Sequence, residues 1–233
     1  MRILTLSSSG NVGKTVIAEH LLAPRLEDTL LIRFGGLRDQ TTQKHWEHRE
    51  EISEMFADLL EYERCIVDVV GGATKRVLAG IHRFASIHNS IDYFVIPVIS
   101  SAKVQLETIA LLDRLAGAGI ETGRVRVAFN RVDPKVGVEN EFGILLNHIS
   151  THGGANANSK AVIFENELFD ILAEENLTIR QVMEDDTDYK ALLHEQKNAD
   201  DALKAHWSNR FGIKCLTKHV KRDLDACYAE LIS

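Results

Sequence analysis

The residues best suited to chemistry lie near the start of the chain, in the run Ser7-Ser8-Ser9-Gly10-Asn11-Val12-Gly13-Lys14-Thr15. An apolar strand is expected before this run, from Arg2 to Leu6, and a helix after it, from Val16 to Leu22. Glycines, a lysine and a hydroxyl between a strand and a helix are typical of a phosphate-binding loop. Backbone N–H groups of such a loop point at the anion, and the helix N-terminus adds the positive end of its dipole.

Each residue type in this loop has an expected task. Gly10 and Gly13 let the backbone approach phosphate oxygens, and Lys14 reaches the β- and γ-phosphates. The Thr15 hydroxyl is a predicted ligand of Mg²⁺. The predicted nucleotide-binding residues of the loop are Ser9, Gly10, Asn11, Val12, Gly13, Lys14 and Thr15. An ordinary turn with an incidental lysine is the alternative, and the flanking strand and helix favour the phosphate-binding loop.

A second informative stretch is Cys65-Ile66-Val67-Asp68-Val69-Val70-Gly71-Gly72. A continuous apolar run of this length suits a parallel strand that is covered on both faces. An aspartate at the end of such a strand, beside a phosphate-binding loop, holds Mg²⁺ directly or through water. We therefore predict Asp68 as a metal residue and Gly72 as a backbone N–H donor to the γ-phosphate, the alternative being a plain strand end and turn.

A third polar cluster, Asn130-Arg131-Val132-Asp133-Pro134, follows the apolar strand Arg126 to Phe129. Ligands of open parallel sheets bind at the carboxyl ends of strands, so Asn130, Arg131 and Asp133 are candidate nucleotide-binding residues. The amide of Asn130 pairs with the N6/N7 edge of a purine, whereas the carboxylate of Asp133 accepts from N1 and N2 of guanine. The base therefore stays open between adenine and guanine, and a simple β-turn is the third interpretation.

The elements that must position these residues alternate between strand and helix. Strands are expected at 2–6, 29–34, 65–70, 93–99, 126–129 and 161–164, and helices at 16–22, 45–63, 74–88, 102–118 and 141–152. Beyond the last strand only helices are expected, at 165–174, 179–183, 189–211 and 216–232. The predicted fold is α/β, a mainly parallel sheet with helices on both faces, as one domain of residues 1–233 whose part from about 165 to 233 is a helical C-terminal extension.

The composition is that of a globular domain, with 233 residues of which 45% are hydrophobic and 26% charged. A net charge of −7 argues against binding nucleic acid through the overall field of the protein. Cysteines at 65, 215 and 227 form no CxxC pair, and the N-terminus lacks a signal-peptide pattern, so we expect a cytoplasmic protein. No apolar run has the length of a membrane span.

The order of these features resembles the ParA/MinD group of deviant-Walker P-loop ATPases. The shared features are the N-terminal loop, the strand ending Asp-x-x-Gly-Gly, a strand with Pro97 followed by Ser100-Ser101 and a helix, and the strand ending Asn130-Arg131. The segment Gly35 to Asp39 is similar to the part of MinD after its second strand. In that group the loop reads Lys-Gly-Gly-x-Gly-Lys-Thr. Here Gly10, Gly13, Lys14 and Thr15 are kept, Ser9 replaces the signature lysine and Asn11 replaces the second glycine.

Within this group the chain looks most like the StbB-type plasmid-stabilisation branch. There a Ser-Gly-Asn-Val-Gly-Lys loop leads to a helix ending Leu-Leu-Ala-Pro-Arg-Leu, as Leu21 to Leu26 do here. The segment Val162 to Leu172 and the later run Asp185 to Tyr189 also resemble that branch. The resemblance implies a cytoplasmic Mg-ATP switch in plasmid partitioning, plasmid stability or conjugative transfer, with a nucleotide-dependent homodimer.

Two departures from the group bear on catalysis. The signature lysine of ParA and MinD reaches the partner's phosphates across the dimer, and Ser9 does not supply that charge. The group also places an aspartate after the second strand, where Asp39 is here the nearest carboxylate. The resemblance therefore names Lys14 and Asp39 as catalytic residues and predicts slow or absent ATP hydrolysis.

Three alternatives stay open. Asn130-Arg131-Val132-Asp133 resembles the guanine motif Asn-Lys-x-Asp, which would make the protein a GTP switch. A binding module without hydrolysis and a biosynthetic enzyme on the same fold are the others. The C-terminal helices are the expected site of a protein partner. DNA binding is expected only indirectly or through the local basic patch Lys214, Lys218, Lys221 and Arg222, which is otherwise a solvated face.

Overall fold

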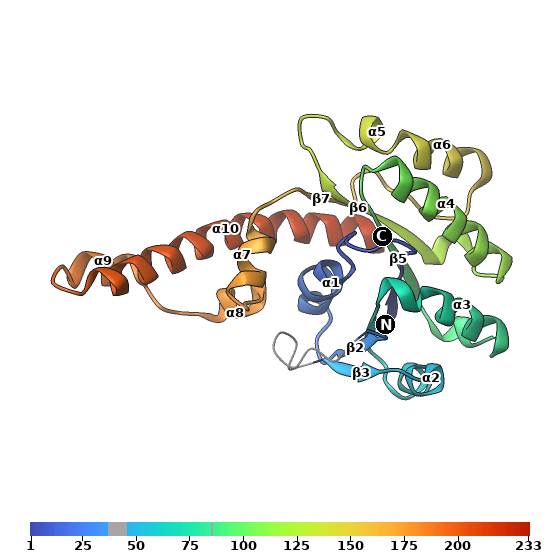
Figure 1. Ribbon diagram of the computed structural model, residues 1–233, viewed down its shortest axis with the longest axis horizontal. Coiled ribbons are helices and arrows are strands. Elements are labelled where there is room, and N and C mark those ends of the chain that lie inside the picture. Colours follow the sequence, from blue (N-terminus) through green and yellow to red (C-terminus); the bar gives the residue numbers. More distant parts are fainter. Residues whose placement is uncertain (37–45, 85) are drawn as a thin grey trace. The chain divides into compact units, whose positions relative to one another are not determined.

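The computed structural model describes residues 1–36, 46–84 and 86–233 of the protein (Figure 1). The chain divides into two compact units. The first consists of Met1–Glu165 together with Ala226–Ser233, and the second of Asn166–Asp225. In the described ranges no helix combines the length and apolar character needed to cross a membrane.

The first unit is built on one parallel sheet of seven strands in the order β3-β2-β4-β1-β5-β6-β7. The strands are β1 Arg2–Thr5, β2 Leu30–Phe34, β3 Glu47–Arg49, β4 Cys65–Val69, β5 Tyr93–Val98, β6 Val125–Val132 and β7 Val162–Phe164. Strand β1 pairs with β4 on one side and β5 on the other, so the strand order reverses there. Open parallel sheets bind ligands at the carboxyl edge beside such a reversal.

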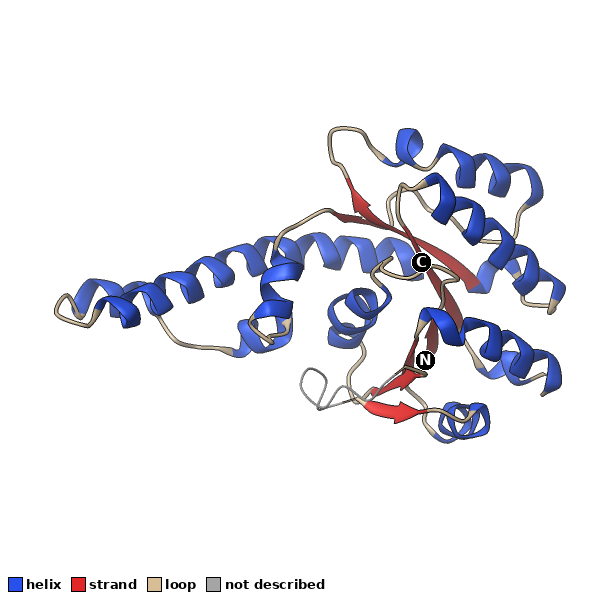
Figure 2. Ribbon diagram, viewed as in Figure 1, coloured by secondary structure: helices blue, strands red, loops and turns tan. Residues whose placement is uncertain are grey.

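Helices cover both faces of this sheet: α1 lies on one side and α3, α4 and α6 on the other (Figures 1 and 2). The helical elements of the first unit are α1 Lys14–Val16, η1 Ile17–Leu22, η2 Ala23–Arg25, α2 Ile52–Glu61, η3 Gly71–Ala73, α3 Thr74–Arg83, η4 Ile87–Ser90, α4 Ala102–Gly117, η5 Thr122–Arg124, α5 Val138–Glu141 and α6 Gly143–His152. The predicted α/β fold with a parallel sheet and a helical C-terminal region is confirmed.

The apolar strands form the core of the first unit. All five residues of β4 are buried, as expected for a strand with helices on both faces. Ile3 and Leu4 of β1 are fully buried beside it. Each such aliphatic side chain stabilises the fold by roughly 1.5–3 kcal/mol relative to leaving it exposed. The buried strands therefore provide a rigid base for the loops at their carboxyl ends.

The seventh strand, β3, corrects the sequence analysis. We predicted a helix from 45 to 63, but Glu47–Arg49 pairs in parallel with β2, and helix α2 begins only at Ile52. His45 lies outside the described residues. The Arg49 side chain donates to Asp58 of α2 at 2.7 Å, and Trp46 is buried. Pairing with the sheet edge and this ion pair override the helical spacing of the apolar residues.

The last residues of the chain belong to the first unit. Asn158 donates hydrogen bonds to the backbone oxygen of Glu230, at 3.1 Å, and to its carboxylate, at 2.8 Å. The Arg25 guanidinium lies over the Tyr228 ring, 5.8 Å from its centroid. These contacts join the end of the chain to the segment before β7 and to η2, which follows the first helix.

The second unit is entirely helical and contains α7 Leu168–Glu174, α8 Ile179–Glu184, α9 Tyr189–Glu195 and the residues of α10 up to Asp225. Helix α10 runs from Asp201 to Ile232 without a break, where we predicted two helices at 189–211 and 216–232. The break lies earlier, between α9 and α10. There the Asp200 carboxylate accepts from the Ala202 N–H at 2.7 Å, which is typical of a helix start.

A polar cluster holds the second unit together. Asp185 accepts hydrogen bonds from the Tyr189 hydroxyl at 2.6 Å and from Arg210 at 3.1 Å. The hydrogen bond from Tyr189, followed by the one from Thr187, holds the pKa of Asp185 well below its usual range. This carboxylate therefore stays ionised, and its role in the second unit is structural.

Candidate functional site

The loop between β1 and α1 has the backbone shape of an anion site. Asn11 and Gly13 both have positive φ, 54° and 87°, and Gly13 is the residue that precedes the helix. Left-handed residues set among right-handed ones turn successive N–H groups toward a common point. Gly13 is required here for two reasons: its φ suits glycine, and an added Cβ would lie 2.1 Å from the Asn130 amide nitrogen.

Hydrogen bonds from neighbouring elements fix this loop. The Thr74 hydroxyl donates to the Ser7 backbone oxygen at 2.7 Å, and the Asn130 amide donates to the Val12 backbone oxygen at 2.9 Å. Both donors are buried. The two bonds anchor the start of the loop to α3, which follows β4, and the end of the loop to β6. The loop shape is therefore set by the rest of the sheet and does not depend on a ligand.

Ser9 lies below the loop surface. Its hydroxyl donates a hydrogen bond to the Glu107 carboxylate of α4, and its N–H donates to the Ser7 hydroxyl at 3.0 Å. Its side chain is therefore occupied inside the protein. The backbone oxygen of Ser9 accepts a hydrogen bond from the Lys14 ammonium at 3.0 Å.

Lys14 carries the positive charge of the loop. Its side chain folds back into the loop, and the residue is only 8% exposed. Burial lowers the pKa of Lys14, the Asp68 charge raises it, and the Arg33 charge lowers it again. A partly desolvated ammonium that lines the cavity is a strong partner for phosphate oxygens.

Asp68 and Thr15 form a pair of oxygen ligands at the carboxyl end of β4. The Thr15 hydroxyl donates to the Asp68 carboxylate at 2.7 Å, and the Thr5 hydroxyl of β1 donates to its other oxygen at 3.3 Å. Asp68 is 2% exposed. Mg²⁺ prefers oxygen ligands and is usually held by one or two carboxylates together with phosphates and water. The hydroxyl and carboxylate of Thr15 and Asp68 fit that requirement.

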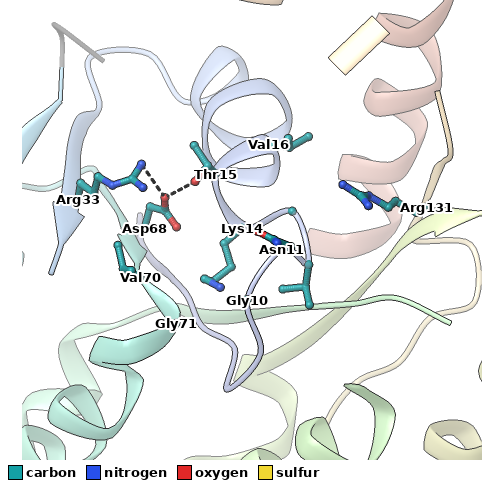
Figure 3. Close-up of a pocket in the computed structure, with 12 residues that line it drawn as sticks. Gly10, Asn11, Lys14, Thr15, Val16, Arg33, Asp68, Val70, Gly71 and Arg131 are labelled. Carbon is teal, nitrogen blue, oxygen red and sulfur yellow. Dashed lines mark hydrogen bonds and ion pairs between the residues drawn. The ribbon is translucent and has the colours of Figure 1, made fainter. Parts of the chain in front are cut away.

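Arg33 is a site residue that the sequence analysis did not name. It lies on β2 directly opposite Asp68 in the register of the sheet, and its guanidinium is 3.8 Å from the carboxylate (Figure 3). Its side chain is 26% exposed. The sequence signal was an arginine at the next-to-last position of an apolar strand. Its meaning depends on β2 lying beside β4, which the strand order shows and the sequence does not.

These groups surround one cavity of about 360 Å³. Its lining consists of Gly10, Asn11, Val12, Gly13, Lys14, Thr15, Val16, Arg33, Asp68, Val70, Gly71 and Arg131. Among them are three cations and one carboxylate, a formal excess of two positive charges in a protein of net charge −7. The charge and the loop conformation together make this cavity an anion site.

Most of the predicted site residues meet in this cavity. The loop from Gly10 to Thr15, Asp68 and Arg131 line it, whereas Ser9 lies below it. Gly71 lines the cavity and Gly72, which we had predicted, does not. A Cβ added to Gly71 would lie 3.3 Å from the Ser9 backbone oxygen, so the close approach falls on Gly71. Asp39 lies outside the described residues.

The residues of the third predicted cluster, Asn130 to Pro134, lie in different environments. The Arg131 backbone has a positive φ of 54° at a register shift of β6, and its side chain lines the cavity. Asn130 is buried beneath the loop, and Asp133 is exposed outside the cavity. The Asp133 carboxylate accepts from the Lys135 N–H at 2.8 Å, and the Asp133 N–H donates to Glu141 at 2.8 Å. This is the local bonding of a turn.

Comparisons with known proteins identify the fold. No protein-family model matches the chain, and no curated protein matches it in sequence. Among solved structures, a chain of the MinC:MinD cell division protein complex of Aquifex aeolicus matches with a TM-score of 0.55 and 15% identity, over 96% of this chain and 95% of that one. Cyanthece apo McdA matches with a TM-score of 0.51 and 15% identity, over 79% of this chain and 94% of that one. The chain has the fold of these proteins.

Proposed function

We propose that the protein is a Mg-ATP-binding switch of the ParA/MinD type with at most a slow ATPase activity. The observation that carries the proposal is the convergence of Lys14, Thr15 and Asp68 on one cationic cavity, around a loop shaped to bind an anion. The fold shared with MinD and McdA supports the same assignment.

Each residue has a task that follows from its position. The N–H groups of Gly10 to Gly13 and the Lys14 ammonium bind the phosphates of the nucleotide. Thr15 and Asp68 hold Mg²⁺, which neutralises phosphate charge when it is bound. The internal hydrogen bonds of Asp133 support ATP over GTP, because the carboxylate that would read guanine is already used in a turn.

The presence of serine at position 9 supports the expectation that ATP hydrolysis is slow. Ser9 occupies the position of the signature lysine in the resemblance to ParA and MinD, and its hydroxyl is bonded to Glu107 within the same chain. A cation placed at a transferring phosphate contributes several kcal/mol of transition-state stabilisation in comparable systems, roughly 10³-fold or more in rate. Loss of that charge makes the chain depend on a partner, or on another of its own residues, for fast turnover.

We place this switch in the cytoplasm, in the positioning or partitioning of a cellular cargo. The resemblance to the StbB-type branch specifies plasmid stability or conjugative transfer. A nucleotide-dependent homodimer and a protein partner bound by the helices of the second unit complete the proposal. The MinC:MinD complex supplies a precedent for a protein partner on this fold.

Light scattering on a size-exclusion column tests the switch directly. The protein is run without nucleotide, with Mg-ADP and with a slowly hydrolysed Mg-ATP analogue, and phosphate release is measured in parallel with ATP. We expect the molar mass to double only with the triphosphate, and Asp68→Asn to prevent the change. Asp28→Asn is the matched control, because Asp28 is exposed in a turn with a φ of 52° that asparagine adopts readily.

The outcomes separate the parts of this proposal. An unchanged mass in all nucleotide states contradicts the nucleotide-dependent homodimer. A mass change without phosphate release keeps the switch and removes the ATPase activity. A mass change with GTP and none with ATP would make GTP the ligand in place of ATP. The proposed phosphate site would then stand unchanged.

A further inference from the structure

We propose that Arg33 recognises the terminal phosphate of a bound nucleoside triphosphate, and that Asp68 holds its guanidinium until Mg²⁺ engages this carboxylate. The inference rests on the proposed Mg-ATP site and assigns a further specificity residue within it. In this account the chain supplies its own cation to the end of the triphosphate.

The position of Arg33 places its charge at the metal end of the cavity. Its guanidinium is 3.8 Å from the same Asp68 oxygen that accepts the Thr15 hydroxyl at 2.7 Å. Mg²⁺ held by Thr15 and Asp68 binds the outer phosphates of a nucleotide in this class of site. Arg33 therefore lies beside the group that distinguishes a triphosphate from a diphosphate.

The positive charges of Arg33 and Lys14 favour the binding of an anion between them. Arg33 and the buried Lys14 lie close enough that the Arg33 charge lowers the pKa of Lys14. Asp68, the carboxylate of the cavity lining, is shared by Arg33, Thr15 and Thr5. The Arg33 and Lys14 charges repel each other in this partly desolvated cavity, and a phosphate bound between them would lower that repulsion.

Metal binding gives Arg33 a reason to move. The Asp68 oxygen that faces Arg33 also faces Thr15, so Mg²⁺ held by these two residues would compete with the guanidinium for that oxygen and would repel it. The Arg33 side chain is 26% exposed and lines the cavity in which a phosphate would bind. A guanidinium is also suited to this task, because its planar fork binds two phosphate oxygens at once.

Arg131 provides a matched comparison within the same cavity. It comes from the end of β6 and lies on the other side of the loop from Arg33, away from Asp68 (Figure 3). The two residues have the same chemistry and line the same cavity, but only Arg33 lies beside the proposed metal ligands. Arg131 is therefore expected to bind parts of the nucleotide that ATP and ADP share.

The test is a set of affinities for Mg-ATP, Mg-ADP and ATP in EDTA, measured by calorimetry on wild type, Arg33→Gln, Arg33→Lys and Arg131→Gln. We expect Arg33→Gln to weaken Mg-ATP binding about tenfold or more and Mg-ADP binding less than about twofold. In EDTA the same variant is expected to weaken ATP binding less than about threefold, because Asp68 then retains the arginine. Arg131→Gln is expected to weaken Mg-ATP and Mg-ADP binding by equal factors.

An ATP-to-ADP affinity ratio that is the same in wild type and Arg33→Gln overturns the inference and leaves the proposed function standing. Wild type that binds neither nucleotide overturns the proposed function itself. If Arg33→Gln does not fold, Arg33→Lys decides, since it keeps the charge and loses the fork. An intermediate ratio in Arg33→Lys supports the inference, and an unchanged ratio contradicts it.

Discussion

Two parts of the same sheet edge carry polar residues, and they use them differently. At the carboxyl ends of β1 and β4, Lys14, Thr15 and Asp68 all line the cavity. At the end of β6, Asn130 is bonded to the loop and Asp133 to its own turn. The polar groups of the first region face a ligand cavity, whereas most of those in the second region form hydrogen bonds within the protein.

The difference between the two regions shows that polar residues at strand ends can have different roles. Position at the carboxyl edge is shared by both regions and does not by itself identify a ligand contact. What separates them is whether a side chain lines the cavity, as Lys14 and Asp68 do, or lies outside it, as Asn130 and Asp133 do. Asn130 then has a function of a different kind, because it supports the phosphate-binding loop from below.

The largest expected effect comes from Gly13→Ala, which disturbs both regions at once. The added Cβ would lie 2.1 Å from the Asn130 amide, at a φ of 87°. We expect a loss of unfolding free energy of about 2–4 kcal/mol. Chemical denaturation measures it, with Gly10→Ala as the control, because a Cβ there meets nothing within 4 Å. Equal unfolding midpoints for the two variants would show that the loop is not packed on Asn130.

The helix behind the loop supplies a pH test of the phosphate region. Burial lowers the pKa of His20 to about 4, and the residue is 6% exposed. Between about pH 6.5 and pH 4 the unfolded chain binds a proton that the folded protein rejects, so His20 costs stability as the pH falls. We expect the stability of His20→Gln to gain about 2 kcal/mol on wild type between pH 7 and pH 4.5.

Urea denaturation of both proteins at the two pH values measures this difference. The comparison between the proteins cancels the carboxylates that titrate in the same range. A stability difference that does not change with pH would mean that His20 has the same pKa in the folded and unfolded protein, and that the helix behind the loop is open to water.

Asn130→Ala distinguishes support of the loop from recognition of a base. The variant loses the buried hydrogen bond to Val12, and we expect a destabilisation of about 1–3 kcal/mol. Nucleotide affinity should fall by similar factors for ATP and GTP. Asn140→Ala is the matched control, since the Asn140 amide donates to the Val136 backbone oxygen at 2.8 Å in an exposed position. A selective loss of affinity for either ATP or GTP would show that Asn130 recognises the base.

Asp133→Ala is expected to have the smallest effect. Its carboxylate is engaged by the Lys135 N–H outside the cavity, so the ratio of ATP to GTP affinity should change by less than about twofold. Competition of each nucleotide against a fluorescent analogue measures the ratio. A loss of GTP binding of about tenfold would contradict the division between the two regions and favour the guanine motif.

The sequence predicted those parts of the site that depend on local spacing. The loop from Gly10 to Thr15 and Asp68 near the end of β4 follow from short local patterns of residue types. Arg33 was missed because its role comes from the lateral order of β2 and β4, which no local pattern encodes. Asn130 was assigned to a base because of its place at a strand end, and its bond to Val12 was missed because the two residues are 118 positions apart.

Long-range contacts also explain where the predicted secondary structure was wrong. The three-residue strand β3 lies in a segment with helical spacing, and only its pairing with β2 makes it a strand. We predicted a helix end at Phe211, but α10 continues through Gly212, because a glycine inside a long helix costs only about 1 kcal/mol relative to alanine. Tertiary context decided both cases.

The central claim is that the cavity beside Lys14 and Asp68 binds the phosphates of a nucleotide with Mg²⁺. The most direct test is the titration of ATP into wild type and Lys14→Ala, with Mg²⁺ and with EDTA, and with Lys160→Ala as a control at an exposed lysine. We expect ATP binding that weakens about tenfold or more in EDTA and is lost in Lys14→Ala but not in Lys160→Ala. Equal binding by Lys14→Ala and wild type would contradict it.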